Sequence, residues 1–241
     1  MKKPQLFLLH FAGGNCHSFN FLQPFLQDFE VFPLELPGRG KRIKEDLLAD
    51  FNIAAEDIFN QVLTRLNGNP FLIYGHSMGA KLTLRVGNLL ELAGRMPVAL
   101  IVSGNAGPGI NEDKETYLLG YNDFILALER LGGIPAEVIR DQELMAFFEP
   151  VLRVDFRLAE NNNMKNEQPV KAPIFALMGS EEENADHISN WARFTHSNFE
   201  HDILNGDHFF IHKYPARIAK IIRQCYAKHI MLQRKAIMKN N

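Results

Sequence analysis

A serine flanked by two glycines is the feature of this sequence best suited to chemistry. The segment Tyr74-Gly75-His76-Ser77-Met78-Gly79-Ala80 follows an apolar run and precedes a helical pattern. In a nucleophile elbow the chain turns sharply from strand to helix, the glycines let neighbouring backbone pass close by, and the serine hydroxyl is exposed at the tip. We therefore predict that Ser77 is the nucleophile of a Ser-His-acid hydrolase.

A Gly-x-Ser-x-Gly motif by itself is weak evidence for a nucleophile elbow, but the residues around this one support the prediction. Residues 70–74 form a short apolar run after the breaker Asn67-Gly68-Asn69-Pro70, which is typical of a buried parallel strand. After the serine, apolar residues recur at helical spacing until Gly94. Ser77 thus lies at a predicted junction between a strand and a helix.

A general base is expected downstream, because the chain order in this kind of site is serine, acid, histidine. His208 lies in Asn205-Gly206-Asp207-His208-Phe209-Phe210, a loop expected to follow a strand and to precede the last helix. We predict that His208 is the base. His76 adjoins the nucleophile in sequence and is interpreted as packing at the elbow. His208 and His212 have i, i+4 spacing, but no third ligand lies nearby, so we expect no metal site.

An oxyanion hole requires two backbone amides directed at the developing negative charge. Met78, directly after the nucleophile, is expected to supply one amide. Ala12, in the glycine turn after the first expected strand, is expected to supply the other. Gly13 and Gly14 are equally consistent with a simple tight turn.

Strands and helices alternate along most of the chain and must position these residues. The expected strands cover residues 6–10, 31–36, 70–74, 98–103, 173–178 and 200–204, and the expected helices cover residues 18–28 and 51–66, the segment after Ser77, and a segment from residue 215. Repeated strand-helix units predict a mostly parallel sheet with helices on both faces and a site at the carboxyl ends of the strands. We expect one α/β-hydrolase domain over residues 1–241.

The alternation stops between Ile110 and Asn166, where only helical patterns are found. Apolar residues are more numerous there than one amphipathic face requires, so we predict a helical lid inserted over the pocket. The residues predicted to bind the acyl chain come from this lid and from the two catalytic loops: Phe11, Phe124, Leu128, Phe147, Phe148 and Phe209.

Composition excludes several other classes of protein. A formal net charge of −2 and a pI near 6.5 provide no basic surface for nucleic acid. Cys16 and Cys225 are too few for a disulfide framework, so we expect a reducing compartment, the cytoplasm. The apolar run from Leu6 to Leu9 is too short for a signal peptide, and no run reaches membrane-spanning length. We expect a monomer that binds no membrane.

These residues together resemble the type II thioesterases that accompany polyketide synthases, nonribosomal peptide synthetases and fatty acid synthase. The resemblance covers nearly the whole chain and depends on Phe11-Ala12-Gly13-Gly14, Leu34-Glu35-Leu36-Pro37-Gly38-Arg39-Gly40-Lys41-Arg42, the Ser77 elbow, Leu131-Gly132-Gly133-Ile134-Pro135, Arg153-Val154-Asp155-Phe156, Trp191 and His208-Phe209-Phe210. It implies hydrolysis of acyl groups from the phosphopantetheine thiol of a carrier protein, a transient partner. Such enzymes remove stalled chains or release product, as in antibiotic biosynthesis, and the chemistry requires no cofactor.

The acid departs from the pattern of the family. Relatives usually have an aspartate three residues after the glycine that follows the strand, whereas here Glu182 stands at that position. Ser-His-Glu sites exist, so Glu182 is the predicted acid. Glu181, Glu183 and Asp186 remain alternatives. A second departure is His10, since relatives often have a proline in this region before Ala-Gly-Gly.

Two other functions remain open from the sequence. A carboxylesterase or lipase-like hydrolase would use the same triad but prefer oxygen esters, and a catalytically impaired acyl-binding module would keep only the pocket. The resemblance also implies an acidic carrier protein. Its expected docking residues follow the Pro-Gly turn and lie on the last helix: Arg39, Lys41, Arg42, Arg217, Lys220 and Arg223.

Overall fold

A six-stranded parallel sheet forms the centre of the protein. The computed structural model describes residues 2–110 and 114–239, with side chains as far as residue 232. The strands are β1 (Gln5–Leu9), β2 (Glu30–Leu34), β3 (Phe71–His76), β4 (Leu100–Ser103), β5 (Ile174–Gly179) and β6 (Phe199–Leu204). They pair in the order β2-β1-β3-β4-β5-β6, with every pair parallel. All six predicted strands are present, with bounds shifted by one or two residues.

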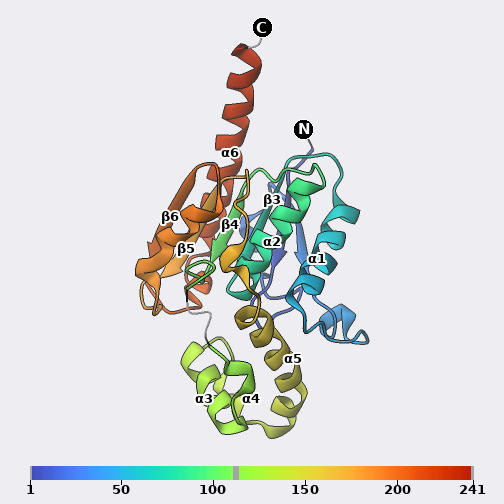
Figure 1. Ribbon diagram of the computed structural model, residues 1–241, viewed down its shortest axis with the longest axis vertical. Coiled ribbons are helices and arrows are strands. Elements are labelled where there is room, and N and C mark those ends of the chain that lie inside the picture. Colours follow the sequence, from blue (N-terminus) through green and yellow to red (C-terminus); the bar gives the residue numbers. More distant parts are fainter. Residues whose placement is uncertain (1, 111–113, 240–241) are drawn as a thin grey trace.

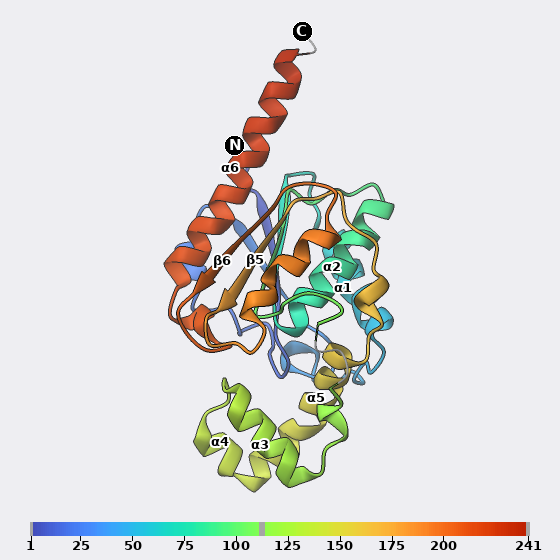
Figure 2. The same ribbon diagram turned by 60° about the vertical axis from the view of Figure 1, so that its left-hand side comes forward.

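Helices cover both faces of the sheet (Figures 1 and 2). Helices α1 (Phe51–Arg65) and α2 (Met78–Leu92) pack with Phe7 and Ile73 in one buried cluster. Helix α6 (Pro215–Lys239) packs with Leu8 and Tyr74 in a second cluster. Successive side chains of a strand point to opposite faces, so the apolar runs of the central strands supply both cores. The doubly covered parallel sheet is confirmed.

The predicted helix over residues 18–28 is wrong. That segment consists of turns and one short 3-10 helix, η1 (Gln23–Phe25). Ser18 Oγ accepts the Asn15 N–H at 2.8 Å, and Asn15 Oδ1 accepts the His17 N–H at 2.8 Å. Such local bonds compete with the helical ladder, and Pro24 has no N–H to contribute to it. The segment still buries Phe19, Leu22 and Leu26 against the sheet.

Between β4 and β5 the chain forms a helical insert beyond the carboxyl ends of the strands (Figure 1). It comprises η3 (Thr116–Leu118), α3 (Tyr121–Leu131), α4 (Ala136–Arg140), α5 (Gln142–Glu160) and η4 (Met164–Asn166). Its own small core consists of Phe124, Leu128, Met145 and Leu152. Residues 111–113 of the predicted lid lie outside the described part of the chain. No strand occurs in the rest of the insert, as predicted; its action as a lid stays a prediction.

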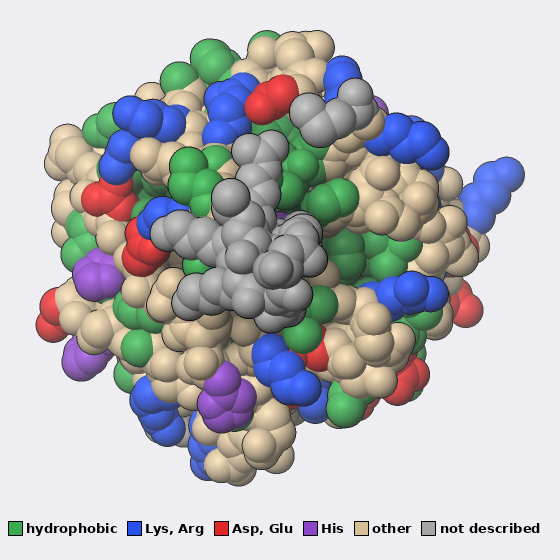
Figure 3. Space-filling model, turned by 90° about the horizontal axis from the view of Figure 1, so that it is seen from above, with side chains coloured by type: hydrophobic (Ala, Val, Ile, Leu, Met, Phe, Trp, Pro, Cys, Tyr) green, Lys and Arg blue, Asp and Glu red, His purple; other side chains and the backbone are tan. Residues whose placement is uncertain are grey.

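Helix α6 continues away from the sheet at the end opposite the insert (Figures 1 and 2). On the face seen from that end, Lys and Arg side chains are spread around the rim, with acidic side chains between them (Figure 3). Within the described residues, none of the helices is both long and apolar enough to cross a membrane.

Candidate active site

The turn between β3 and α2 presents Ser77 in a constrained backbone conformation. Ser77 has φ 57° and ψ −115°, a region that non-glycine residues rarely occupy. A Cβ atom at Gly75 would lie 2.0 Å from the Gly79 carbonyl oxygen, and one at Gly79 would lie 2.3 Å from the Leu9 carbonyl oxygen. Both positions therefore require glycine, because backbone segments approach each other there. The structure has the strand-turn-helix geometry predicted for the motif.

His208 connects Ser77 to a carboxylate. His208 Nε2 lies 2.9 Å from Ser77 Oγ, and His208 Nδ1 lies 2.7 Å from Glu182 Oε2. Glu182 Oε1 accepts the Gly179 N–H at 2.8 Å, which folds the carboxylate back onto its own loop. All three side chains follow the carboxyl ends of strands β3, β5 and β6. With the proton on Nδ1, the ring can accept the Ser77 proton at Nε2 while Glu182 orients it and stabilises the imidazolium.

Of the four acids left open by the sequence, Glu182 is the one that contacts His208. Glu183 is 72% exposed and pairs with Lys114 at 2.9 Å. Asp186 is 80% exposed and lies 3.8 Å from His187. Glu181 is also exposed. The geometry therefore favours Glu182 as the acid and places the alternative Asp186 in solvent.

His76 packs against the ring of His208 and is fully buried. Its Nδ1 lies 2.8 Å from Ser103 Oγ, and its ring centroid lies 5.0 Å from that of His208. Burial lowers the pKa of His76 well below its usual value, and the charges of His208 and His212 act in the same direction. A neutral ring at this position adds no positive charge beside the base, in agreement with the packing interpretation.

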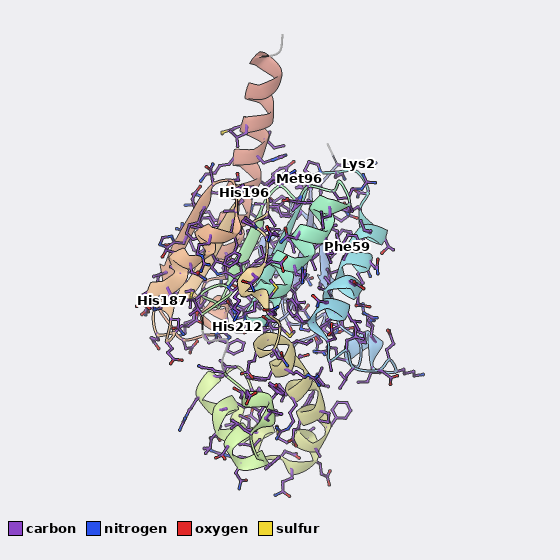
Figure 4. All side chains as sticks on the ribbon, viewed as in Figure 1. Lys2, Phe59, Met96, His187, His196 and His212 are labelled. Atoms are coloured by element: carbon purple, nitrogen blue, oxygen red, sulfur yellow. The ribbon has the colours of Figure 1, made fainter. Side chains whose placement is uncertain are left out.

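Three other histidines lie away from the Ser77–His208 contact. His187 and His196 are exposed on the outer part of the molecule (Figure 4). His212 lies near the junction of the sheet and the insert, with its ring stacked on Phe209 at 6.0 Å. Within the described residues, no group of three or more His, Cys, Asp or Glu side chains is arranged to hold a metal ion.

A cavity of about 760 Å³ opens over Ser77 and His208. Ala12 lines it as well, and Met78 follows Ser77 at the start of α2, so both predicted oxyanion amides belong to segments at this cavity. Its wall is mixed, and the polar side chains in it include Lys81, Lys114, Arg130, Glu160, Asn184 and Asp207. No sequence pattern marks Lys81 or Glu160, because both stand on helices whose faces look unremarkable.

Glu160, at the end of α5, is an unusual group in this wall. Its Oε2 is buried and has no hydrogen-bond partner among the described residues. Burial raises the pKa of Glu160, although Thr116 and Lys114 act in the opposite direction. Nearby, Lys81 Nζ donates to the Ala159 carbonyl oxygen at 3.0 Å.

A second, apolar cavity of about 280 Å³ lies between the glycine turn and the insert. Ala12, Leu131 and Phe156 line both cavities, so the two adjoin each other. Four of the six residues predicted to bind the acyl chain line the apolar cavity: Phe11, Leu128, Phe148 and Phe209. Met145 and Leu152 line it too. They lie three residues before and four residues after Phe148, so helical spacing places all three on one face and could have identified them.

Phe124 and Phe147 are corrections to that prediction, since neither lines either of these two cavities. Phe124 is fully buried inside the insert, beneath the Arg153 guanidinium at 4.3 Å. Phe147 is 59% exposed on the outer side of α5. Helical spacing identifies an apolar face but not which neighbour covers it.

Most of the basic residues predicted to dock a carrier protein are already paired. Arg39 is buried against Asp155. The other pairs are Arg42 with Glu45 and Asp57, Arg217 with Asp202, and Arg223 with Asp28. Lys41 and Lys220 are exposed. Arg39 therefore cannot form part of a docking surface, and the remaining charges are largely balanced by neighbours.

Comparisons with known proteins agree with this geometry. A family model described as a thioesterase domain matches residues 4–228. Among curated relatives, LgrE of Brevibacillus parabrevis, named a linear gramicidin dehydrogenase, is 28% identical over 94% of this chain and 89% of its own. The gramicidin S biosynthesis protein GrsT of Aneurinibacillus migulanus is 32% identical over 88% of this chain and 84% of its own. The solved structure of YbtT, a type II thioesterase from the yersiniabactin pathway, has a TM-score of 0.86 at 27% identity, covering 95% of this chain and 94% of that one.

Proposed function

We propose, from the premise that this chain belongs to the thioesterase family, that it hydrolyses acyl thioesters held on the phosphopantetheine arm of carrier proteins. The observation that carries the proposal is the hydrogen-bonded series from Ser77 through His208 to Glu182. It lies at a cavity with a mixed lining that adjoins an apolar one. The polar side chains in the first cavity suit the amide-containing arm, and the apolar cavity suits the acyl chain.

The proposed reaction has two steps. His208 Nε2 accepts the Ser77 proton as Oγ attacks the thioester carbonyl carbon, and the Ala12 and Met78 N–H groups stabilise the oxyanion. The thiol leaves with the proton from His208, which leaves an acyl group on Ser77. Water then attacks the acyl-enzyme, again with His208 as base, and releases the carboxylic acid. These groups and water account for every bond made and broken, so we propose that no metal or redox cofactor takes part.

Synthase carrier domains are the proposed partners. GrsT is named for gramicidin S biosynthesis, and YbtT for a yersiniabactin pathway that combines nonribosomal peptide and polyketide synthesis. We place this chain in the same kind of system, as a monomer in the cytoplasm that meets its carrier transiently. LgrE carries the name of a dehydrogenase. For this chain, the Ser77–His208 contact favours hydrolysis.

A comparison of three matched substrates tests the proposal. The substrates are an acyl carrier protein, the same acyl group on free pantetheine, and the corresponding oxygen ester. We expect kcat/KM to fall in that order. An oxygen ester hydrolysed at least as well as both thioesters would overturn the proposal in favour of a carboxylesterase. Equal rates for the first two substrates would remove carrier recognition while leaving a thioesterase.

A further inference from the structure

The glycine turn after β1 is held by side chains on both sides of Ala12. The Phe11 carbonyl oxygen accepts the Gly14 N–H at 2.9 Å and lies 2.8 Å from His10 Nδ1. Two residues later, the Gly13 N–H donates to Asp155 Oδ2 at 2.7 Å. The peptide group before Ala12 is thus held by its carbonyl, and the one after Ala12 is held by its N–H.

Holding the Phe11 carbonyl also sets the direction of the Ala12 N–H. The Phe11–Ala12 peptide is trans, and in a trans peptide the N–H and C=O point in opposite directions. The Ala12 N–H therefore points away from His10 and Gly14. Ala12 lines the same cavity as Ser77.

The acceptor for the Gly13 N–H is itself held rigidly. Asp155 is fully buried on α5, and Arg39, from the loop after β2, is only 5% exposed. Arg39 Nη2 donates to Asp155 Oδ1 at 2.9 Å, and Arg39 Nη1 contacts Oδ2. A bidentate, charge-assisted pair of this kind fixes orientation as well as distance. The pair joins three segments: the glycine turn, the loop after β2 and the helix that leads into the insert.

His10 acts in the same direction from the other side of the turn. It is 3% exposed, and its Nε2 accepts the Leu36 N–H at 3.5 Å. A ring that accepts at Nε2 carries its proton on Nδ1, which it then donates to the Phe11 carbonyl oxygen. Burial lowers the pKa of His10 to about 4, and the Arg39 charge adds to this effect. The ring is neutral near neutral pH, as this arrangement requires.

We propose that His10 and the Arg39–Asp155 pair are positioning residues, which hold the Ala12 N–H in the direction of the oxyanion formed on the substrate. The inference rests on the proposed function, in which that N–H is one of two oxyanion donors. Removal of one such donor costs about 10²–10³ in kcat in a serine protease. Misdirection of a donor that is still present has a smaller effect, so we expect a loss of roughly 10- to 100-fold.

The decisive variant removes the whole ion pair, as Arg39→Met with Asp155→Leu. Replacing a buried pair by apolar side chains often preserves stability, whereas removing one partner does not. We expect kcat/KM to fall about 10- to 100-fold relative to wild type, by analogy with loss of an oxyanion donor. The affinity for an alkyl trifluoromethyl ketone, which forms an anionic tetrahedral adduct on Ser77, falls by the same factor. Affinity for an inert thioether analogue of the substrate stays within about twofold.

A second pair of variants keeps the proposal testable if the double variant does not fold. His10→Leu removes the donor to the Phe11 carbonyl, whereas His10→Asn supplies an amide N–H in place of Nδ1. We expect His10→Leu to lose ketone affinity and His10→Asn to recover most of it. A general loss of stability would instead lower the ketone affinity of both variants to a similar extent.

The matched control is Arg42→Met with Asp57→Leu. Arg42 holds Asp57 in the same bidentate way, at 2.6 and 2.9 Å, and its other side-chain hydrogen bonds among the described residues go to Glu35 and Glu45, not to the glycine turn. We expect lower thermal stability and unchanged ketone affinity. The proposal is overturned if a folded Arg39–Asp155 or His10 variant keeps both kcat/KM and ketone affinity within twofold of wild type, or if thioether affinity falls equally. A wild-type enzyme that forms the ketone adduct but hydrolyses no thioester would defeat the proposed function alone.

Discussion

The carboxyl edge of the sheet and the helical insert both line the two cavities, but they position the lining side chains by different means. At the sheet edge, backbone packing leaves no room for a Cβ at Gly75 or Gly79, and His208 is held from both ring nitrogens. In the insert, the apolar side chains that line the second cavity are held by packing around a four-residue apolar core. We therefore propose that the sheet edge performs the chemistry and that the apolar side chains of the insert set the fit to the acyl chain.

A large effect, second only to loss of Ser77 itself, should come from the acid at the sheet edge. Glu182→Gln keeps the shape of the side chain but loses the charge that stabilises the His208 imidazolium. We expect kcat to fall by about 10³–10⁴, as for the corresponding change in serine proteases. Steady-state rates on one acyl thioester, with folding checked by thermal melting, measure this.

Glu183→Gln and Asp186→Asn are the matched controls, because both carboxylates are exposed on the same loop. We expect rates within about twofold of wild type, as for exposed groups away from the reacting atoms. A large loss in Asp186→Asn together with an active Glu182→Gln would show that the acid is wrongly assigned.

A smaller effect, and one of a different kind, is expected from the insert. Phe148 lines the apolar cavity and is 39% exposed, whereas its neighbour Phe147 lines neither of the two cavities and is 59% exposed; their rings meet edge to face at 5.2 Å. We expect Phe148→Ala to change the ratio of kcat/KM between octanoyl and acetyl thioesters by about tenfold, the scale of hydrophobic pocket contacts. Phe147→Ala should change that ratio less than twofold. If both variants changed the octanoyl-to-acetyl ratio equally, the proposal that the apolar cavity binds the acyl chain would be contradicted.

The smallest effect concerns Glu160, where the two regions meet. Its pKa is raised by burial, so at pH values above that pKa the folded protein carries a charge in an unfavourable place. The stability gained from protonation is present at low pH and is lost as pH rises through the folded pKa. Glu160→Gln should therefore melt near wild type at pH 4 and higher than wild type at pH 8.

For a chain of this size, each kcal/mol corresponds to roughly 2–4 °C in melting temperature, so we expect a difference of a few degrees at pH 8. Glu183→Gln is the control, because that side chain is 72% exposed. A Glu160→Gln variant that is less stable than wild type at pH 8 would show that the carboxylate is held favourably instead.

The sheet edge was also the more predictable region from the sequence. Ser77 and His208 were identified because glycines and loop position mark backbone geometry directly. Glu182 could not be separated from its three acidic neighbours by residue type. That distinction depends on the Gly179 N–H, which holds the Glu182 side chain toward the histidine.

Local side-chain bonds and tertiary contacts account for the predictions that were wrong. Residues 18–28 have apolar spacing suited to a helix, but local side-chain bonds and Pro24 favour turns. The helical pattern predicted that Phe124 and Phe147 line the pocket, but Phe124 is buried inside the insert and Phe147 is exposed to solvent. Apolar periodicity cannot separate these two environments from a cavity wall. From the sequence, Arg39 is expected to be a surface charge, but in the structure it pairs with Asp155, 116 residues away. Long-range partners of this kind leave no local signal.

The central claim is that Ser77 becomes acylated through His208 during turnover, and intact-mass analysis of the enzyme mixed with an octanoyl thioester tests it most directly. We predict an octanoyl adduct on the wild-type enzyme within the first turnovers, located at Ser77 by peptide mapping. Ser77→Ala should show no adduct and lose activity by about four to six orders of magnitude. Ser180→Ala, an exposed serine on the neighbouring loop, should behave as wild type. An adduct that persists in Ser77→Ala, or turnover that continues there near the wild-type rate, would contradict the account.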